Sequence, residues 1–162
     1  KPAPMGYLDE PYPQFSEGGI TQIASALDNT SKTRALFEIN KGANIYDHID
    51  VNSKVNGTNR RVPFQNMIYI ADGPSDVPAF SIINQYGGRT YAIYPRGDHH
   101  AFRQVDTLRQ DGRIHMYGEA DYTQGTPTHM WLMDHSRQIA ERIAREKEEI
   151  IRRSAGEPPK HL

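Results

Sequence analysis

The chain has 162 residues, enough for one ordinary domain with a hydrophobic core. Its formal net charge of -1 lacks the basic surplus typical of proteins that bind nucleic acids or anionic membranes. No apolar run reaches the length of a membrane span. The chain contains no Cys, which excludes disulfides and thiolate metal sites and leads us to expect a cytoplasmic protein. We therefore expect neither a nucleic acid nor a membrane as partner.

The composition divides the chain into three stretches. Residues 1–19 are crowded with Pro and Gly, which predicts an extended connector. Residues 20–127 alternate apolar and polar segments as a folded core does. Residues 128–162 predict a long helix, rich in charged side chains and ending in a short tail with two Pro residues.

The first helix expected in chain order covers residues 32–40. Asn29, Thr30 and Ser31 offer N-cap side chains, and Gly42 is placed to end the helix. Lys32 opens this helix, where the helix dipole disfavours a cation. A solvated surface lysine is the ordinary interpretation of such a position, and a lysine placed to bind an anion is the alternative.

The segment 43–65 that follows is predicted to be a polar surface loop. Asp47 and Asp50 stand there as D-x-x-D, but no apolar strand precedes them, so we assign them to the loop. Arg60 and Arg61 near its end are typical of a solvated turn, and contact with an anionic group is the other option.

Next comes the stretch that carries the chemistry. Residues 67–71 form a short apolar run that predicts a buried parallel strand. Asp72 ends the run, Gly73 and Pro74 predict a tight turn, and Asp76 follows at the mouth of a helix over residues 77–86. In open parallel sheets ligands bind at this carboxyl edge. Two carboxylates without His or Cys suit Mg²⁺, which takes one or two carboxylates together with phosphate oxygens.

A simpler interpretation of the two acids remains open. Asp72 is also a residue that forms Asx-turns, and Asp76 is also a residue that caps helices. The spacing D-x-x-x-D is by itself a weak signal.

The rest of the chain continues the alternation. We expect a strand at 90–94, a helix at 101–110, a strand at 114–117 and a helix at 128–155. This order predicts an α/β fold, a Rossmann-like parallel sheet with flanking helices. The seven His residues are scattered, and the adjacent pair His99 and His100 would point in opposite directions in a strand, so we expect no zinc site.

At this point a family resemblance can be stated. The segment Ile68–Pro78 resembles the fourth motif of the haloacid dehalogenase (HAD) superfamily, a strand ending in G-D-x-x-x-D, with Ala71 in place of the usual Gly. The resemblance implies that Asp72 and Asp76 hold the catalytic Mg²⁺. Residues 29–42 resemble the third motif, which implies that Lys32 binds the substrate phosphate; Lys41 is the other candidate.

The resemblance is to half of the family's core. The first motif, an apolar strand ending in D-x-D that supplies the nucleophile and the general acid and base, has no counterpart here, and Thr30 would be only a guess for the second motif. We therefore expect an incomplete HAD core, the C-terminal half, covering roughly residues 21–143. The missing half would come from other residues or from a second chain, a homo-oligomer included.

Two functions follow as expectations. The first is part of a Mg²⁺-dependent phosphohydrolase that cleaves a phosphorylated small molecule through an aspartyl-phosphate, inactive without its nucleophile. The alternative is a non-catalytic binding or assembly module that retains a degraded HAD core. The substrate cannot be read, because no cap element is recognisable.

Overall fold

The structure is a computed structural model of the whole chain. It describes residues 28–43, 45–46, 49–54 and 60–155. The chain divides into two compact units, Lys1–Arg61 and Val62–Leu162. The predicted connector at 1–19, the start of the predicted core at 20–27 and the tail at 156–162 lie outside the described residues.

The first unit contains helix α1 (Asn29–Lys41). Its N-cap is Asp28, whose carboxylate accepts a hydrogen bond from the Ser31 backbone N–H at 2.6 Å. The prediction that Asn29, Thr30 and Ser31 precede the helix is wrong, because the cap one position earlier already satisfies the first turn. Gly42 ends the helix at φ 82°, a conformation that favours glycine, as predicted.

The loop that follows α1 is tied to the helix by its own side chains. Arg60 donates a hydrogen bond to the fully buried Asn40, and Arg61 donates to the Tyr46 hydroxyl at 3.1 Å. Asp50 accepts the Asn52 backbone N–H at 2.7 Å. These contacts are structural, which agrees with the loop assignment for Asp50; Asp47 lies outside the described residues.

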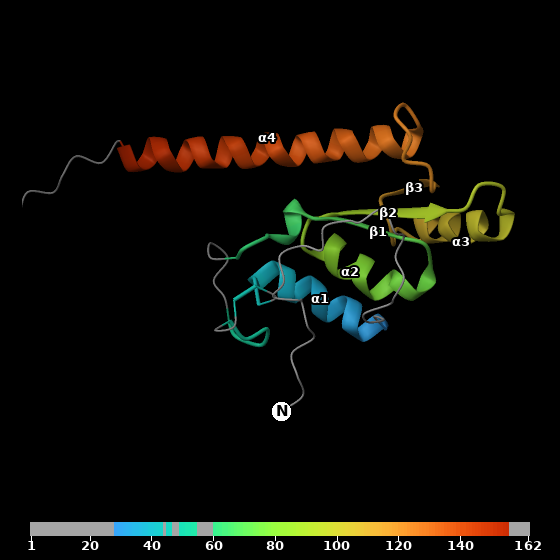
Figure 1. Cartoon of the computed structure of the whole chain (residues 1–162), viewed down its shortest axis with the longest axis horizontal. Helices are drawn as coiled ribbons and strands as arrows, with labels where there is room; N and C mark the ends of the chain where they lie inside the picture. Colours follow the sequence, from blue (N-terminus) through green and yellow to red (C-terminus); the bar gives the residue numbers. More distant parts are fainter. Residues whose placement is uncertain (1–27, 44, 47–48, 55–59, 156–162) are drawn as a thin grey trace, which may run out of the picture. The chain divides into compact units, whose positions relative to one another are not determined.

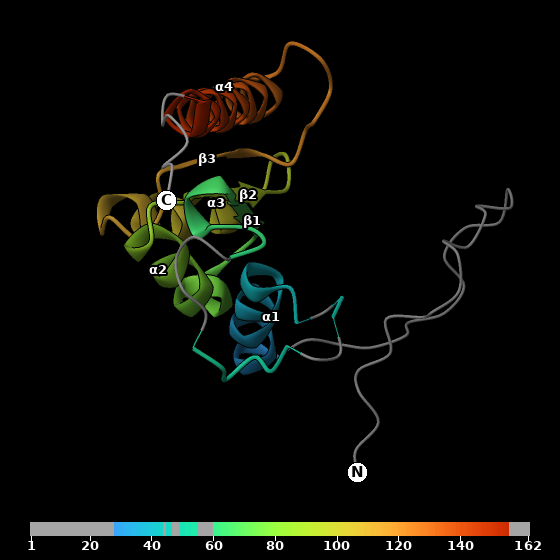
Figure 2. The ribbon, with the colours of Figure 1, turned by 90° about the vertical axis from the view of Figure 1, so that its left-hand side faces the viewer.

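The second unit is built on a parallel sheet of β1 (Ile68–Ala71), β2 (Arg89–Tyr94) and β3 (Met116–Glu119) in the order β1-β2-β3. Ile70 pairs with Tyr91, and Ala92 pairs with Tyr117. The connections are α2 (Val77–Gln85) and α3 (His99–Gln110), and α4 (Pro127–Ala155) follows β3. Figures 1 and 2 show α2 and α3 on one face of the sheet and α4 on the other. The expected α/β class, a parallel sheet with flanking helices, is confirmed.

This arrangement follows from strand geometry. Successive crossovers of one hand place their helices on one face, and alternate strand residues face opposite sides. Ala92 therefore packs in the core under α2 and α3, in a cluster with Phe80, Val105, Leu108 and Ile114. Its neighbour Tyr91 points the other way and packs on Trp131 of α4, with ring centroids 4.7 Å apart.

Two predicted boundaries were wrong. Helix α3 begins at His99 rather than at residue 101, because the Asp98 carboxylate caps it by accepting the His100 and Ala101 N–H groups at 2.9 Å. His99 and His100 therefore belong to a helix and not to a strand. Strand β3 covers Met116–Glu119 rather than residues 114–117, because the His115 N–H is shared between the Thr90 hydroxyl at 3.0 Å and the Thr90 carbonyl at 3.3 Å.

Strand β1 lies at an edge of this sheet. In the part of the chain that the structure describes, its partner is β2 alone. The prediction of a fully buried strand was wrong for one face, since 37% of Ile70 is exposed. Helix α4 packs against β3 and, through Trp131, against β2.

Candidate metal centre

Asp72 is the first residue after β1, at the carboxyl edge of the sheet. It is exposed, and within the described residues no group donates a hydrogen bond to its carboxylate. Gly73 is fully extended, at φ -177° and ψ -169°, and the chain bends in the 3-10 turn η3 (Pro74–Asp76) instead. The Asp76 N–H closes this turn on the Gly73 carbonyl at 3.1 Å. The predicted turn therefore lies between the two acids and brings the chain into α2.

Asp76 is buried, with 2% of its surface exposed. It occupies the N-cap position of α2, and Pro78 lies in the first helical turn as expected. Its carboxylate, however, makes no capping hydrogen bond. Oδ1 instead accepts the Tyr69 hydroxyl at 2.6 Å, and Oδ2 accepts the Ser75 hydroxyl at 3.3 Å. The simpler interpretation of Asp76 as a helix cap therefore does not account for its side chain.

Tyr69 is the site residue that the sequence analysis missed. It lies in β1 on the face covered by α2, with its ring edge-on to Phe80 at 5.5 Å between centroids. Burial raises the pKa of Tyr69, and the hydrogen bond to Asp76 and the charges of Asp76 and Asp72 raise it further. The phenol therefore stays protonated at neutral pH and remains a donor. A tyrosine inside an apolar strand signals that its hydroxyl needs a partner, but not which one.

The two carboxylates fit a hard cation. Both are oxygen ligands on one strand–turn–helix element, and the charges of both act on the Tyr69 phenol. Among the described residues no group of three or more His, Cys, Asp and Glu could hold a metal ion. Mg²⁺ needs no such group, since one or two carboxylates with substrate phosphate oxygens and water complete its shell. The residues present therefore offer the type of ligand that Mg²⁺ takes, and binding of the ion stays a prediction.

Lys32 and Lys41 lie at opposite ends of α1. The Lys32 N–H makes the first helical hydrogen bond to the Asp28 carbonyl at 2.9 Å, so Lys32 lies at the end of the first turn. The Lys41 ammonium donates to the carbonyls of Val51 and, at 2.7 Å, Ser53. Lys41 thus fastens the loop after α1, which weakens it as a phosphate ligand. Lys32 belongs to the first compact unit, so its approach to the two carboxylates stays a prediction.

Further charged residues follow the neighbouring strands at the same edge. Arg96, after β2, lies 3.7 Å from the Glu119 carboxylate at the end of β3, and both are exposed to solvent. Hydrogen bonds from Thr123, and then the charge of Arg96, hold the pKa of Asp121 below its usual value. Sequence reasoning did not single out these residues, because it considered each strand end separately.

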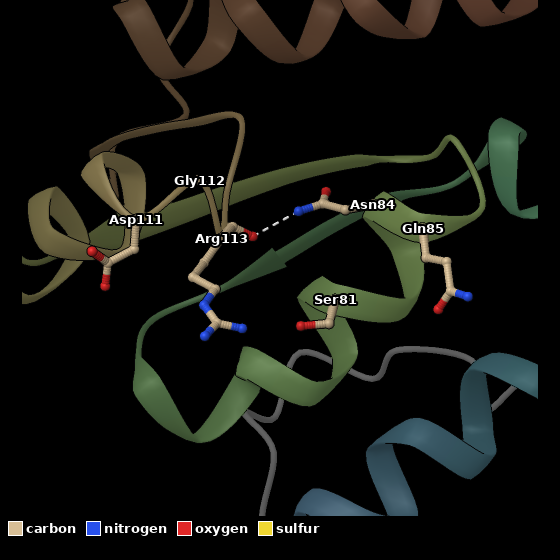
Figure 3. Close-up of a pocket in the computed structure, with 6 residues that line it drawn as sticks. All are labelled: Ser81, Asn84, Gln85, Asp111, Gly112 and Arg113. Atoms are coloured by element: carbon tan, nitrogen blue, oxygen red, sulfur yellow. Dashed lines mark hydrogen bonds between the residues drawn. The ribbon is translucent and has the colours of Figure 1, made fainter.

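The structure also contains an open hollow of about 580 Å³ that does not involve these acids (Figure 3). Its walls come from the end of α2 and the turn after α3, and Asn84 links them by donating to the Arg113 carbonyl at 2.7 Å. Helices that follow parallel strands return to the amino edge, so this hollow lies at the edge opposite Asp72. We assign no chemistry to it.

Comparison with known proteins finds similarity to a bacterial protein. The chain is 39% identical over 125 residues to an uncharacterized protein of Borreliella burgdorferi. The match covers 75% of this chain and 41% of that relative, so the chain spans less than half of the relative's length. No protein-family model matches the chain, and no solved structure matches it. Within the described residues, no helix is long and apolar enough to cross a membrane.

Proposed function

We propose that this chain is part of a HAD-like, Mg²⁺-dependent phosphohydrolase that acts in the cytoplasm on a phosphorylated small molecule. Asp72 and Asp76 hold the cation, and Lys32 holds the substrate phosphate. The nucleophilic Asp comes from residues outside this chain, joined to it or on a second chain. The observation that carries the proposal is the buried Asp76 carboxylate, which lies at the mouth of α2 without capping it.

The roles of the chain's own residues follow from their positions. Asp76 offers a carboxylate that Tyr69 holds in one orientation, and Asp72 offers an exposed carboxylate at the end of β1. Bound there, Mg²⁺ supplies positive charge that offsets the charge developing on the phosphoryl group. A lysine ammonium at a phosphate binds as a point charge and needs no fixed planar geometry.

The unpaired edge of β1 and the length of the relative support an incomplete core. In this fold the strand with the nucleophile would lie beside β1, and that side of β1 has no partner among the described residues. The segment matched here makes up 41% of the Borreliella protein, so a related chain carries this segment together with many other residues.

The alternative function, a non-catalytic binding or assembly module, is favoured by the missing D-x-D motif. A module of this kind would use the β1 edge and the exposed Ile70 for contact with another chain. Retention of both acids in the arrangement described above is the reason we rank it second.

Hydrolysis of p-nitrophenyl phosphate tests the proposal. We expect the isolated chain to show no turnover above background with Mg²⁺, because the covalent route requires the absent nucleophile. The product of the complete reading frame that encodes this segment should hydrolyse the ester with Mg²⁺, and Asp72→Asn should abolish turnover. Absence of turnover in that complete product would instead favour the assembly module. Metal-dependent turnover by the isolated chain would show that a nucleophile has been overlooked.

A further inference from the structure

The far half of α4, residues 144–154, has the sequence of a packed helix but no packing partner among the described residues. We propose that one face of this half binds an apolar segment of the complete protein that lies outside these 162 residues. The segment carries an acidic side chain opposite Lys147. The inference does not depend on the phosphohydrolase assignment. It shares with that assignment only the view that the chain works as part of a longer protein.

Helix α4 is longer than the sheet on which it lies. Its 29 residues span about 43 Å, whereas the six residues of β2 span about 20 Å. The docked half is held by Trp131, whose ring packs on Tyr91, and by Arg142, which donates to Asn66 Oδ1 at 2.8 Å. Every residue from 144 to 154 is exposed. Figure 1 shows this half of the helix running beyond the sheet.

The residues of this half are sorted by charge around the helix axis. At 3.6 residues per turn, a stripe about 120° wide runs along residues 140–154 and contains one charged side chain, Lys147. Every residue of this segment outside the stripe is Glu or Arg. A stripe of this width is typical of a helix that buries one face. We call it the isoleucine stripe, and its other members are Ala140, Ile143, Ala144, Ile150, Ile151 and Ser154.

The isoleucine stripe is open to solvent in the part of the chain that the structure describes. Ile150 is 67% exposed and its neighbour Ile151 is 65% exposed. Apolar side chains that are exposed singly need no explanation, but a continuous apolar stripe marks a surface that binds something. A helical segment of about 12 residues without tertiary contacts is also marginal in water. We therefore expect this half of α4 to gain its stability from a partner.

Lys147 argues against a second copy of this chain as that partner. In a parallel pair of α4 helices each residue lies opposite its own copy, so Lys147 faces Lys147. In the antiparallel pair that matches Ile143 with Ile151, residue 147 is the midpoint and again faces itself. Like charges placed opposite each other are unfavourable. A different segment can place an acidic side chain there instead.

The related Borreliella protein is long enough to supply such a segment. The region matched here makes up 41% of that protein, so more than half of its length lies outside the match. We therefore assign the partner of the isoleucine stripe to residues of the complete protein that this chain does not contain.

Hydrogen exchange measured by mass spectrometry tests the proposal on two proteins, the 162-residue chain and the product of the complete reading frame. We expect the amides of residues 144–155 to exchange freely in the isolated chain. In the complete product they should exchange at least about tenfold more slowly, because burial of one isoleucine side chain is worth that factor or more. Ile151→Glu in the complete product should return this segment to the exchange rate of the isolated chain.

Arg152→Gln is the matched control. It lowers the net charge by one, as Ile151→Glu does, but on the charged side of the same helix turn. It should keep the protection of residues 144–155. Peptides from α2 and β2 report whether each variant keeps its core folded. If Ile151→Glu unfolds the core, Ile151→Ala gives the same comparison with a smaller loss of protection.

The contrary outcomes are distinct from one another. Free exchange of residues 144–155 in the complete product overturns the proposal and leaves the isoleucine stripe solvated. Equal loss of protection in Ile151→Glu and Arg152→Gln overturns it too, because the stripe is then not the surface that binds. Protection already present in the isolated chain places the partner within these 162 residues, or in a second copy if it rises with concentration, and either result overturns the assignment. None of these readouts requires phosphatase turnover, so failure of the proposed function and failure of this inference are distinguishable.

Discussion

At the scale of single residues, the structure joins the side chains of Asn84 and His115 to Thr90, which is fully buried in β2. The Thr90 hydroxyl donates to Asn84 Oδ1 at 2.9 Å, and the Thr90 N–H donates to His115 Nδ1 at 3.2 Å. His115 returns a bond from its own N–H to the Thr90 hydroxyl. This network links the end of α2, the start of β2 and the approach to β3.

A neutral His115 lets Nδ1 accept the Thr90 N–H, and the Thr90 hydroxyl lies 2.8 Å from the same ring nitrogen. Partial desolvation of the ring lowers the pKa of His115 below its usual value of 6.5, and the positive charges of Arg89, His135 and Arg109 lower it further. Below pH 6.5, His115 therefore binds a proton in the unfolded chain but stays neutral in the folded chain until the pH reaches its lowered pKa. The free energy of unfolding should fall as the pH drops below 6.5 towards the lowered pKa.

His115→Asn tests this prediction, because an amide oxygen can accept the Thr90 N–H but does not titrate. Urea unfolding of both proteins between pH 8 and pH 5 should show a smaller loss of stability on acidification in the variant. The other His residues are common to both proteins, so they cancel in the comparison. Parallel stability curves would mean that His115 does not contribute to the pH dependence.

At the scale of elements, α4 is docked on the sheet through Gly118 of β3. A Cβ at Gly118 would lie 2.3 Å from the Tyr91 hydroxyl and 2.7 Å from the Thr128 hydroxyl. Those hydroxyls are 3.0 Å apart, and Thr128, buried in the first turn of α4, also donates to the Glu119 carbonyl at 2.7 Å. The absence of a side chain at Gly118 thus makes room for the junction of β2, β3 and α4.

Gly118→Ala should lower the free energy of unfolding by about 1–3 kcal/mol, the usual cost of an extra methyl group in a packed site. Gly73→Ala is the matched control, since its backbone is extended and nothing lies within 4 Å of the added Cβ. That control should be neutral or slightly stabilising. Urea unfolding measures both, and equal stabilities for the two variants would contradict this account of the junction.

The far half of α4 has a different character from its docked half. Residues 144–154 are all exposed, including Ile150 at 67% and Ile151 at 65%. The favourable charge order along this half is seen in the pair Arg153 and Glu149, 3.7 Å apart. This half of α4 therefore makes no buried contact within the described part of the chain.

At the scale of the whole molecule, the free edge of β1 within the described residues leads us to expect that the chain associates with another chain. A strand edge with an exposed apolar side chain is a site for pairing with another chain. We expect the isolated chain to self-associate in a concentration-dependent way, measured by sedimentation velocity. Ile70→Glu should reduce that association, because it places a charge on the exposed face of β1.

Ile151→Glu serves as the control for this prediction, because Ile151 is exposed on α4 and far along the chain from β1. It should leave association unchanged if the β1 edge is responsible. If Ile151→Glu reduced association and Ile70→Glu did not, the contact between chains would lie on α4 instead. A cooperatively folding monomer at all concentrations would show that the chain closes its own sheet and that the half-domain interpretation is mistaken.

The local pattern of apolar and polar residues was sufficient to predict the order and type of the main helices and strands. The apolar run at 67–71, the strand at 90–94 and the helix at 128–155 were predicted within one or two residues of β1, β2 and α4. The helix end at Gly42 was predicted as well. These features depend on periodicity and on backbone preferences of neighbouring residues, which a sequence displays directly. The position of Asp72 and Asp76 on either side of one turn could be predicted for the same reason, because it depends only on neighbouring residues.

Only the tertiary structure decided which partners the polar side chains take. Tyr69 lies seven residues from Asp76, and Thr90 lies 25 residues from His115. Lys41 was a candidate phosphate ligand by sequence, and the structure places its ammonium on the loop carbonyls instead. The start of β3 shifted for the same reason, since Thr90 of β2 accepts the His115 N–H. The start of α3, in contrast, is set locally by the Asp98 cap. A buried polar group must form a hydrogen bond. Which partner it takes depends on how the helices and strands pack across the sheet, and the periodicity of the sequence does not contain that information.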